Sequence, residues 1–377
     1  MDFDLSPDHE LIRRTARDFA EQEVGPAAEH LDKTKSFPYE IVRKLGDLGF
    51  MGIPFPEEYG GAGADSLAYA IAVEELTRVD SSVAITMCAH TSLGTQPVYL
   101  FGTEEQKQRL LPDLCSGRKL GAFGLTEPEA GSDAGNVRTR AALQDGEWVI
   151  NGAKQFITNA GTEISGHVAI TARTGDDEIS NLIVENGTPG YEQGEPYRKM
   201  GWNASDTRPL TFEDCRVPEE NLLGPRGQGF HQFLEILDGG RISVAAMGVG
   251  LAQGAYDLAY AYAKEREQFG RPIAKFQAIQ FQLADMATEI EAGRALVLKA
   301  AWLKDQGRPF AREAAMAKLY TGELSHRVAN QALQIHGGFG YMEEAAISRL
   351  YRDQKILEIG EGTNEVQRMV IAKHLGL

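Results

Sequence analysis

The segment RLYRDQKILEIGEGTNEVQR, residues 349–368, carries the most unusual local pattern of the chain. An apolar run ending at Ile359 leads directly into Glu361, which has a glycine on either side, and Thr363 then opens a new helical pattern. Glycine allows positive φ and lets other groups approach closely. A carboxylate held there loses solvation, which raises its pKa toward neutral. On this segment alone two interpretations stay open: a general base, or a turn glutamate paired with a nearby arginine.

Length and composition indicate a multidomain globular protein. A chain of 377 residues exceeds one ordinary hydrophobic core, so two or three domains are expected. Its 42% hydrophobic and 24% charged residues are typical of globular chains. The net charge of −16 argues against nucleic acid and against anionic membrane surfaces as partners. No apolar run approaches the ~18 residues of a membrane span, so no membrane insertion is expected.

Two features predict a cytoplasmic location. The first ten residues, MDFDLSPDHE, are acidic and lack the basic and then apolar regions of a signal peptide. The three cysteines, Cys88, Cys115 and Cys215, are odd in number, far apart and without a CxxC motif, which favours reduced thiols in a cytosol. We expect Cys115 and Cys215, which have no base beside them in the sequence, to be structural residues.

The first 120 residues are predicted to be helical. Ser6 is a plausible N-cap, with Pro7 at the first helical position. Thr103 and Gln106 form a capping box for a helix that ends near Gly117. The other helices expected in this part span about residues 39–48, 66–79 and 82–101.

The pattern then changes to short strands over residues 120–223. Asp145-Gly146 stands between two short apolar runs, which is a strong hairpin signal. We expect an antiparallel β domain here, joined to the rest by the Gly/Pro segment LLGPRGQGF, residues 222–230.

From Phe230 the helical period returns and continues to the C-terminus. Long helical patterns cover residues 230–266 and 276–290, a third follows Pro309, and a fourth follows QIHGGFGY. Short loops between long helices predict an antiparallel four-helix bundle. The expected fold class is therefore mostly α, α+β, with a helical domain at residues 1–120, a β domain at 121–228 and a helical bundle at 229–377.

In this architecture the chain resembles the acyl-CoA dehydrogenases over nearly its whole length. Six motifs in the family's order carry the resemblance: FGLTEPEAGSDAG (123–135), KQFITNAG (154–161), LDGGRI (237–242), REQFGRPIAKFQAIQ (266–280), QIHGGFGY (334–341) and the segment 349–368. The resemblance implies FAD, a homotetramer built as a dimer of dimers with an FAD site shared between subunits, and a place in fatty acid β-oxidation. It also implies α,β-dehydrogenation of a fatty acyl-CoA to the trans-2-enoyl-CoA, with electrons passing to electron-transfer flavoprotein.

The chemistry requires a base that takes the α-proton of the thioester while the developing enolate oxygen is stabilised. The β-hydride then passes to flavin N5. The resemblance implies Glu361 as the catalytic base, and its own backbone N–H with a flavin ribityl hydroxyl as the enolate stabilisers, so no metal is expected. Some branched-chain and long-chain relatives carry the base at the position matching Gly240. Glycine at that position favours Glu361 and the straight- or short-chain type.

The resemblance also implies the cofactor contacts. Thr126 offers a hydroxyl to the flavin ring, Thr158 donates toward N5, and Phe156 covers one face where many relatives have Trp. Arg266 matches a residue that reaches the pyrophosphate of FAD in a neighbouring subunit. The full set is Phe123, Leu125, Thr126, Gly131, Ser132, Phe156, Ile157, Thr158, Arg266, Phe269, Gln277, Gln334, Ile335, Gly337, Gly338, Thr363, Asn364 and Glu365.

For the acyl-CoA the family pattern implies Ser132, Asp238, Arg241 and Gly362. From spacing alone, Arg241 is equally explained by an i,i+3 ion pair with Asp238. Residues 84–95 contain no arginine, which argues against the dicarboxylate recognition of glutaryl-specific relatives. The side chains expected to wall the acyl tail are apolar, which suits a short to medium chain. They are Ile85, Met87, Leu93, Val98 and Tyr256.

Other functions stay open from the sequence. An oxygen-using acyl-CoA oxidase or related flavin oxidase would share the fold, although family oxidases are typically longer than 377 residues. A branched-chain or dicarboxylyl-CoA dehydrogenase is a closer variant of the same activity. A non-enzymatic helical scaffold is the third class, and the presence of Glu361 together with the flavin segments argues against it.

Overall fold

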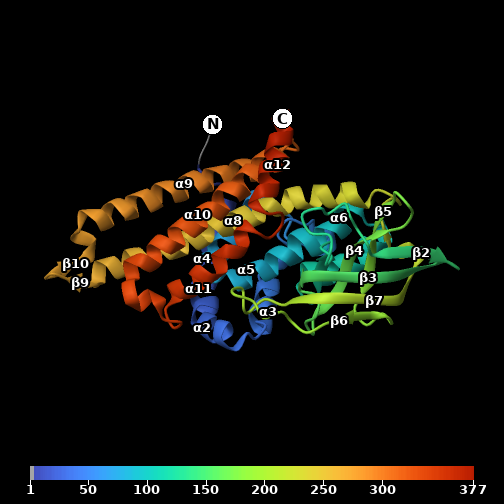
Figure 1. Cartoon of the computed structure of the whole chain (residues 1–377), viewed down its shortest axis with the longest axis horizontal. Helices are drawn as coiled ribbons and strands as arrows, with labels where there is room; N and C mark the ends of the chain where they lie inside the picture. The colour runs from blue at the N-terminus through green and yellow to red at the C-terminus, as the bar shows by residue number, and fades with distance from the viewer. Residues whose placement is uncertain (1–3) are drawn as a thin grey trace.

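The structure is a computed structural model that describes residues 4–377. Figure 1 shows an elongated molecule with a β sheet at one end and long helices running away from it. The chain passes from helices through the sheet into a second set of helices, as the sequence predicts. Residues 1–3, which belong to the expected first domain and to the acidic N-terminus, lie outside the described residues.

The first helices begin at their predicted caps. The Ser6 hydroxyl accepts from the His9 backbone N–H at 3.3 Å, and the Thr103 N–H donates to Gln106 Oε1 at 2.9 Å in the expected capping box. The helical elements are α1 (Pro7–Phe19), η1 (Ala20–Val24), α2 (Gly25–Thr34), α3 (Tyr39–Asp47), η2 (Phe50–Gly52), η3 (Glu57–Tyr59), α4 (Ser66–Val79), α5 (Ser81–Cys88), η4 (Ala89–Thr95), α6 (Gln96–Phe101) and α7 (Glu104–Cys115).

The helix expected over residues 82–101 forms in three consecutive sections, α5, η4 and α6. It starts at Ser81 because Asp80 caps it, accepting from the Val83 N–H at 3.0 Å. Its middle section η4 is π-helical, a local widening that sequence periodicity did not reveal. His90 in η4 bonds the Leu114 carbonyl and the Gly121 N–H, both at 3.0 Å, and so ties this helix to α7 and to the sheet.

The β domain has one mixed feature. Asp145 and Gly146 both have positive φ, 53° and 82°, and form the predicted hairpin between β2 and β3. Most pairings are antiparallel as expected, but β4 pairs in parallel with β1 and, through one residue pair, with β2. The strands are β1 (Leu120–Gly124), β2 (Arg140–Gln144), β3 (Glu147–Thr158), β4 (Ser165–Arg173), β5 (Ile179–Glu185), β6 (Tyr191–Gln193), β7 (Thr207–Pro218) and β8 (Leu222–Leu223), with η5 (Glu219–Asn221) before β8.

The C-terminal part contains three long helices and then two short ones. The expected fourth helix is short, and the separate helix expected to open at Thr363 follows a left-handed turn at Glu361 and Gly362. The elements are α8 (Gly229–Glu265), β9 (Glu267–Gln268), β10 (Arg271–Pro272), η6 (Ile273–Lys275), α9 (Gln277–Asp305), α10 (Ala311–His336), η7 (Gly337–Tyr341), α11 (Ala346–Asp353), η8 (Gln354–Glu358) and α12 (Asn364–His374).

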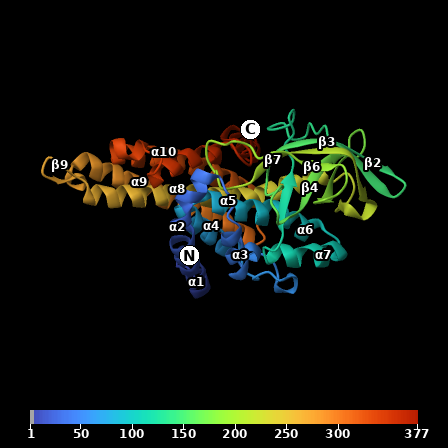
Figure 2. The ribbon, with the colours of Figure 1, turned by 90° about the horizontal axis from the view of Figure 1, so that it is seen from below.

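Helix α8 connects the parts of the molecule. Its N-terminal residue Phe233 belongs to a buried cluster with α6, α7 and the sheet, and Figure 2 shows α6 and α7 beside the sheet. Further along, α8 packs so closely on α4 that a Cβ at Gly250 would lie 2.3 Å from the Glu74 carbonyl oxygen. The largest core accordingly combines residues from both helical parts. Within residues 4–377, no helix is both long enough and apolar enough to cross a lipid bilayer.

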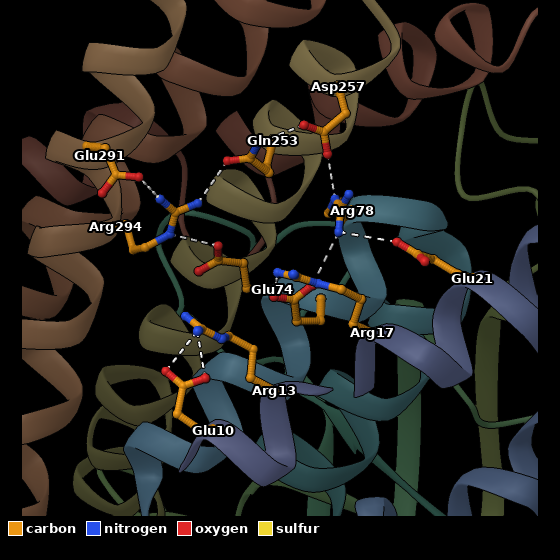
Figure 3. Close-up of polar contacts among 11 residues, drawn as sticks. Glu10, Arg13, Arg17, Glu21, Glu74, Arg78, Gln253, Asp257, Glu291 and Arg294 are labelled. Atoms are coloured by element: carbon orange, nitrogen blue, oxygen red, sulfur yellow. Dashed lines mark hydrogen bonds and ion pairs between the residues drawn. The ribbon is translucent and has the colours of Figure 1, made fainter. Parts of the chain in front are cut away.

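A charged network reinforces the contact between the two helical parts, as Figure 3 shows. Arg294 on α9 donates to Glu74 Oε1 on α4 at 2.8 Å and to Gln253 Oε1 on α8 at 2.9 Å. Arg78 on α4 donates to Asp257 on α8 at 2.5 Å. Burial raises the pKa of Glu74, and the charge of Arg294 opposes that rise, so Arg294 is the main compensation for a carboxylate enclosed between helices.

Replacing Arg294 with methionine is expected to lower the free energy of unfolding by about 2–3 kcal/mol, because Glu74 would stay enclosed without its cation. Thermal unfolding against the wild type measures the effect. The control is Arg43→Met, whose side chain is 62% exposed and pairs with Glu40 on the surface, and whose effect is expected to be much smaller. Equal effects of the two substitutions would contradict a stabilising role for the network.

Candidate active site

Glu361 lies in a turn between η8 and α12 in which two consecutive residues are left-handed. Glu361 has φ 53° and Gly362 has φ 88°, a conformation that costs energy for a residue with a side chain. Thr363 then caps α12, its hydroxyl accepting from the Val366 N–H at 3.3 Å. The sequence pattern of a glutamate between glycines therefore corresponds to a left-handed turn between two helical elements.

The Glu361 carboxylate is buried without a hydrogen-bond partner. The residue as a whole is partly exposed, but both carboxylate oxygens are buried, and neither accepts a hydrogen bond from the described part of the chain. Loss of solvent raises the pKa of Glu361 to about 7, against the opposing positive charges of Lys318 and Arg241. At neutral pH this carboxyl group is poised to accept a proton.

Apart from the cations Lys318 and Arg241, the groups beside Glu361 are a glycine and uncharged side chains. A Cβ at Gly240 would lie 2.4 Å from Glu361 Oε2 and 3.5 Å from Leu93 Cδ2, so α8 can pass the carboxylate only with glycine there. Tyr69 and Cys88 are buried nearby, and burial together with the Glu361 charge raises the pKa of each above its usual value. Both are therefore neutral at physiological pH.

The predicted acyl-CoA residues lie along α8 and the Glu361 turn. Arg241 is 3% exposed, and its Nη1 donates to Asp238, so the ion pair suggested by their spacing is formed. Arg241 Nε has no partner among the described residues. Burial raises the pKa of Asp238, and Arg241 opposes that rise. Ser132 is exposed in the loop between β1 and β2, and Gly362 carries its carbonyl toward α10.

The cofactor residues predicted in the β domain differ in exposure. Phe156 is 60% exposed, has φ 62° and lies beside Tyr197, so its ring is free to cover a planar group. Leu125, Thr126 and Thr158 are partly exposed. Phe123 and Ile157 are instead buried. Gly131 is exposed, with open space where a Cβ would stand.

The other cofactor residues gather at the opposite end of the helices. Arg266, Ile335, Gly337 and Gly338 line one pocket together with Tyr262 and Phe339. Phe269, which is 93% exposed, and Gln277 lie at the adjacent turn into α9, and Gln334 precedes the pocket on α10. Figure 1 shows β9 and β10 at the end of the long helices remote from the sheet. Within one chain, these residues are therefore separated from Phe156, whereas Thr363, Asn364 and Glu365 adjoin Glu361.

Two residues that contact the Glu361 turn were not predicted. Lys318 on α10 donates to the Gly362 carbonyl at 2.8 Å, and Gln367 on α12 donates to the same oxygen at 2.8 Å. A sequence signal existed for Lys318: Ala314, Ala317 and Thr321 follow the spacing of a buried helical face, and Lys318 stands on it.

Fold and site together define a class of flavin-using oxidoreductase whose site holds a buried, unpartnered carboxylate. Family models describe three consecutive parts of the chain: acyl-CoA dehydrogenase N-terminal domain over residues 6–118, middle domain over 122–215 and C-terminal domain over 227–376. The chain therefore belongs to the acyl-CoA dehydrogenase family. It is an oxidoreductase that dehydrogenates an acyl-CoA.

Two relatives are similar along their full length. A probable acyl-CoA dehydrogenase of Bacillus subtilis is 54% identical over 380 residues, covering 100% of this chain and 100% of the relative. A short-chain specific acyl-CoA dehydrogenase of Clostridium acetobutylicum is 48% identical over 374 residues, covering 99% of each chain.

Solved structures agree with the fold. Butyryl-CoA dehydrogenase from Megasphaera elsdenii matches with TM-score 0.97 and 45% identity, covering 100% of both chains. A structure described as the electron transferring flavoprotein of Acidaminococcus fermentans matches with TM-score 0.97 and 48% identity, covering 100% of this chain and 99% of the other. An acyl-CoA dehydrogenase from Bacillus anthracis complexed with FAD matches with TM-score 0.94 and 36% identity. The match covers 99% of this chain and 67% of the other.

The family is FAD-dependent, and the residues present fit this cofactor. Phe156 offers an exposed aromatic face, and Gly131, Gly337 and Gly338 each leave open space within 4 Å of the position of a Cβ. Such positions let a backbone approach a bulky planar or phosphorylated group. FAD is accordingly the cofactor of this chain.

Gly240→Ala is expected to displace the Glu361 carboxylate and to slow acyl-CoA dehydrogenation about a hundredfold, because its Cβ would stand 2.4 Å from Glu361 Oε2. Anaerobic stopped-flow reduction of the flavin by butyryl-CoA measures the rate. The matched control is Gly239→Ala, whose Cβ would meet only the flexible end of Lys304, at 3.3 Å. Similar rates in the two variants would mean that Glu361 tolerates a side chain at residue 240.

Proposed function

We propose that this chain converts a short-chain saturated acyl-CoA to the trans-2-enoyl-CoA, with Glu361 as the base that removes the α-proton. The supporting observation is a carboxylate that is buried, unpartnered and shifted in pKa to about 7. Asp238 is the nearest acidic alternative on α8, but its charge is committed to Arg241. A free carboxylate is the better proton acceptor of the two.

In the proposed reaction each residue of the site has a separate task. Glu361 takes the α-proton onto its carboxylate. Its backbone N–H, which belongs to the same rigid turn, is assigned to the thioester oxygen as negative charge develops there. Phe156 and Thr158 orient the cofactor from the β domain, and buried apolar side chains exclude water from the acyl tail. When bound, FAD supplies the acceptor of the β-hydride.

Support for a short acyl chain comes from two sources. The Clostridium acetobutylicum relative is short-chain specific, and the Megasphaera elsdenii structure is a butyryl-CoA dehydrogenase. In this chain Leu93 closes on Gly240 beside the carboxylate, and Met87 and Val98 are fully buried. Apolar side chains at these positions suit a short acyl tail. A medium chain and a branched or dicarboxylyl group are the remaining substrate alternatives.

For the electron acceptor we propose electron-transfer flavoprotein. The similarity to the Acidaminococcus fermentans structure supports this acceptor. An oxygen-using oxidase is the alternative, and rapid reoxidation of the reduced enzyme by air would favour it.

The separation of the two groups of cofactor residues supports a homotetramer with shared sites. Arg266 directly precedes β9 and lines the Gly337-Gly338 pocket, whereas Phe156 is on β3, and Figure 1 shows β9 and β3 at opposite ends of the molecule. Arg266 and this pocket are therefore proposed to serve the FAD of a neighbouring subunit. We also propose domains at residues 1–120, 121–228 and 229–377. The buried, unpaired Cys88, Cys115 and Cys215 support a reducing compartment such as the cytoplasm.

Glu361→Gln is expected to retain FAD and acyl-CoA binding but to slow flavin reduction by at least ~10³-fold, because the amide cannot accept the α-proton. The measurement is anaerobic titration of the yellow holoenzyme with saturated acyl-CoAs from butyryl to palmitoyl, in which the wild type should bleach most readily with the shortest. Glu358→Gln, three residues earlier in an ion pair with Lys355, is the control. A Glu361→Gln enzyme that bleaches at the normal rate would move the base elsewhere, with Asp238 tested next.

Arg266→Ala is expected to weaken FAD retention about tenfold or more, since the guanidinium is proposed to bind the pyrophosphate of a neighbouring subunit's cofactor. Fluorescence of FAD released on dilution gives the affinity, and sedimentation gives the assembly state. Lys264→Ala removes a cation two residues away that lies over the Tyr260 ring and should leave retention unchanged. Identical retention in both variants would argue against a site shared between subunits.

A further inference from the structure

The Gly362 carbonyl is held by two donors from different helices. Lys318 Nζ on α10 and Gln367 Nε2 on α12 each donate to it at 2.8 Å, and Gln367 also donates to the Glu361 carbonyl at 3.3 Å. This carbonyl belongs to Gly362, the second of the two left-handed residues of the turn. Because an unfavourable backbone conformation persists only when its surroundings hold it in place, these donors fix the direction in which the Glu361 side chain leaves the backbone.

Lys318 is an unusually placed cation. It is 1% exposed, and no carboxylate of residues 4–377 lies within ion-pair distance of its ammonium group. Its acceptors are the Gly362 carbonyl and, at 3.4 Å, Asn364 Oδ1. Burial lowers the pKa of Lys318 to about 8, and the Glu361 charge is the strongest influence opposing that fall. An ammonium group enclosed this way is costly unless a nearby negative charge offsets it.

Lys318 and Glu361 therefore act as a separated charge pair joined through the turn. The same cation that bonds the backbone of the turn lowers the pKa of the carboxylate. Gln367 shares only the first of these actions, because it donates to the turn without carrying a charge. Variants of the two residues therefore distinguish the effect of holding the turn from the effect of keeping the Glu361 carboxylate ionised.

We propose that Lys318 is a positioning residue for Glu361, which fixes the turn through the Gly362 carbonyl and keeps the carboxylate ionised at neutral pH through its positive charge. The proposal rests on the proposed role of Glu361 as the base. The Glu361 carboxylate remains available to substrate, because Lys318 bonds the following carbonyl rather than the carboxylate itself.

The charged and titratable groups facing this pair come from every element packed around it. From α8 come Arg241, which adds positive charge, and its partner Asp238. From η8 and α12 come Glu358, already paired with Lys355, and Glu365. From α4 and α5 come the neutral Tyr69 and Cys88. Lys318 and Arg241 are therefore the cations that lower the pKa of Glu361, and Arg241 is already bonded to Asp238.

The test compares pH profiles of flavin reduction by butyryl-CoA in three holoenzyme variants. Lys318→Gln keeps a donor but removes the charge, so the pH at which reduction sets in should rise by about one unit, with an almost unchanged plateau at high pH. At pH 7 that shift corresponds to an about fivefold slower reduction. Gln367→Leu removes a donor but no charge, so its onset should stay in place while its plateau falls about tenfold. Lys318→Met should show both changes.

Lys299→Met is the control, since Lys299 is 59% exposed on α9 and should leave onset and plateau unchanged. A second readout avoids hydride transfer: acetyl-CoA has α-hydrogens but no β-carbon, so their exchange for deuterium in D₂O reports proton removal alone. In the exchange, the α C–H bond breaks, the proton passes to the base, and a deuteron from solvent replaces it on carbon. The onset pH of exchange should shift in Lys318→Gln as the onset of reduction does.

An unchanged onset in Lys318→Gln would overturn the proposal. So would a Lys318→Met enzyme whose only change is a lower thermal midpoint, because Lys318 would then be merely structural. If Lys318→Met does not fold, the pH profiles of Lys318→Gln and Gln367→Leu still test the proposal. Failure of the proposed function is distinguishable: Glu361→Gln would then keep normal reduction of the flavin, whatever the Lys318 variants do.

Discussion

The site depends on a carboxylate that is buried without a hydrogen bond. Burying an ionised group with no partner is among the costliest arrangements in a protein. The structure compensates at a distance rather than by direct contact, with Lys318 bonding the next carbonyl and Arg241 paired to Asp238. Direct bonds to the Glu361 oxygens would have solvated the carboxylate and lowered its pKa, which would weaken it as a base near neutral pH. The strained turn, the glycine at residue 240 and the buried lysine all follow from keeping these two oxygens free.

Helix α8 makes this arrangement possible because it belongs to every part of the molecule. Its first turns pack on the sheet through Phe233, its middle passes Glu361 at Gly240, and its later turns lie against α4 at Gly250. The network of Arg294, Glu74 and Gln253 then fixes α4, α8 and α9 relative to one another. Small shifts of α8 would change the distance between the carboxylate and whatever the β domain holds. Rigid packing of the helices is therefore part of the geometry of the site.

Local signals in the sequence predicted local structure, and tertiary contacts explain what was missed. Ser6, the Thr103–Gln106 capping box and the Asp145-Gly146 hairpin are correct because each depends on neighbouring residues alone. The parallel pairing of β1 with β4 and the π-helical η4 depend on partners far away in the sequence, such as those His90 contacts, so periodicity could not reveal them. The pattern around Glu361 predicted its turn and its desolvation. Lys318, which is 44 residues before Gly362, had only the weak signal of a lysine on a buried helical face.

Gly240 provides the strongest link between the sequence and the position of the proposed base. A Cβ at this residue would stand 2.4 Å from Glu361 Oε2, well inside contact distance. A side chain on α8 at this residue would therefore displace the Glu361 carboxylate from the position it holds. Glycine at residue 240 is therefore sterically required for Glu361 to hold its position. A glycine in the middle of a helix costs about 1 kcal/mol of helix propensity. At residue 240 the absence of a side chain leaves the space that the Glu361 carboxylate occupies.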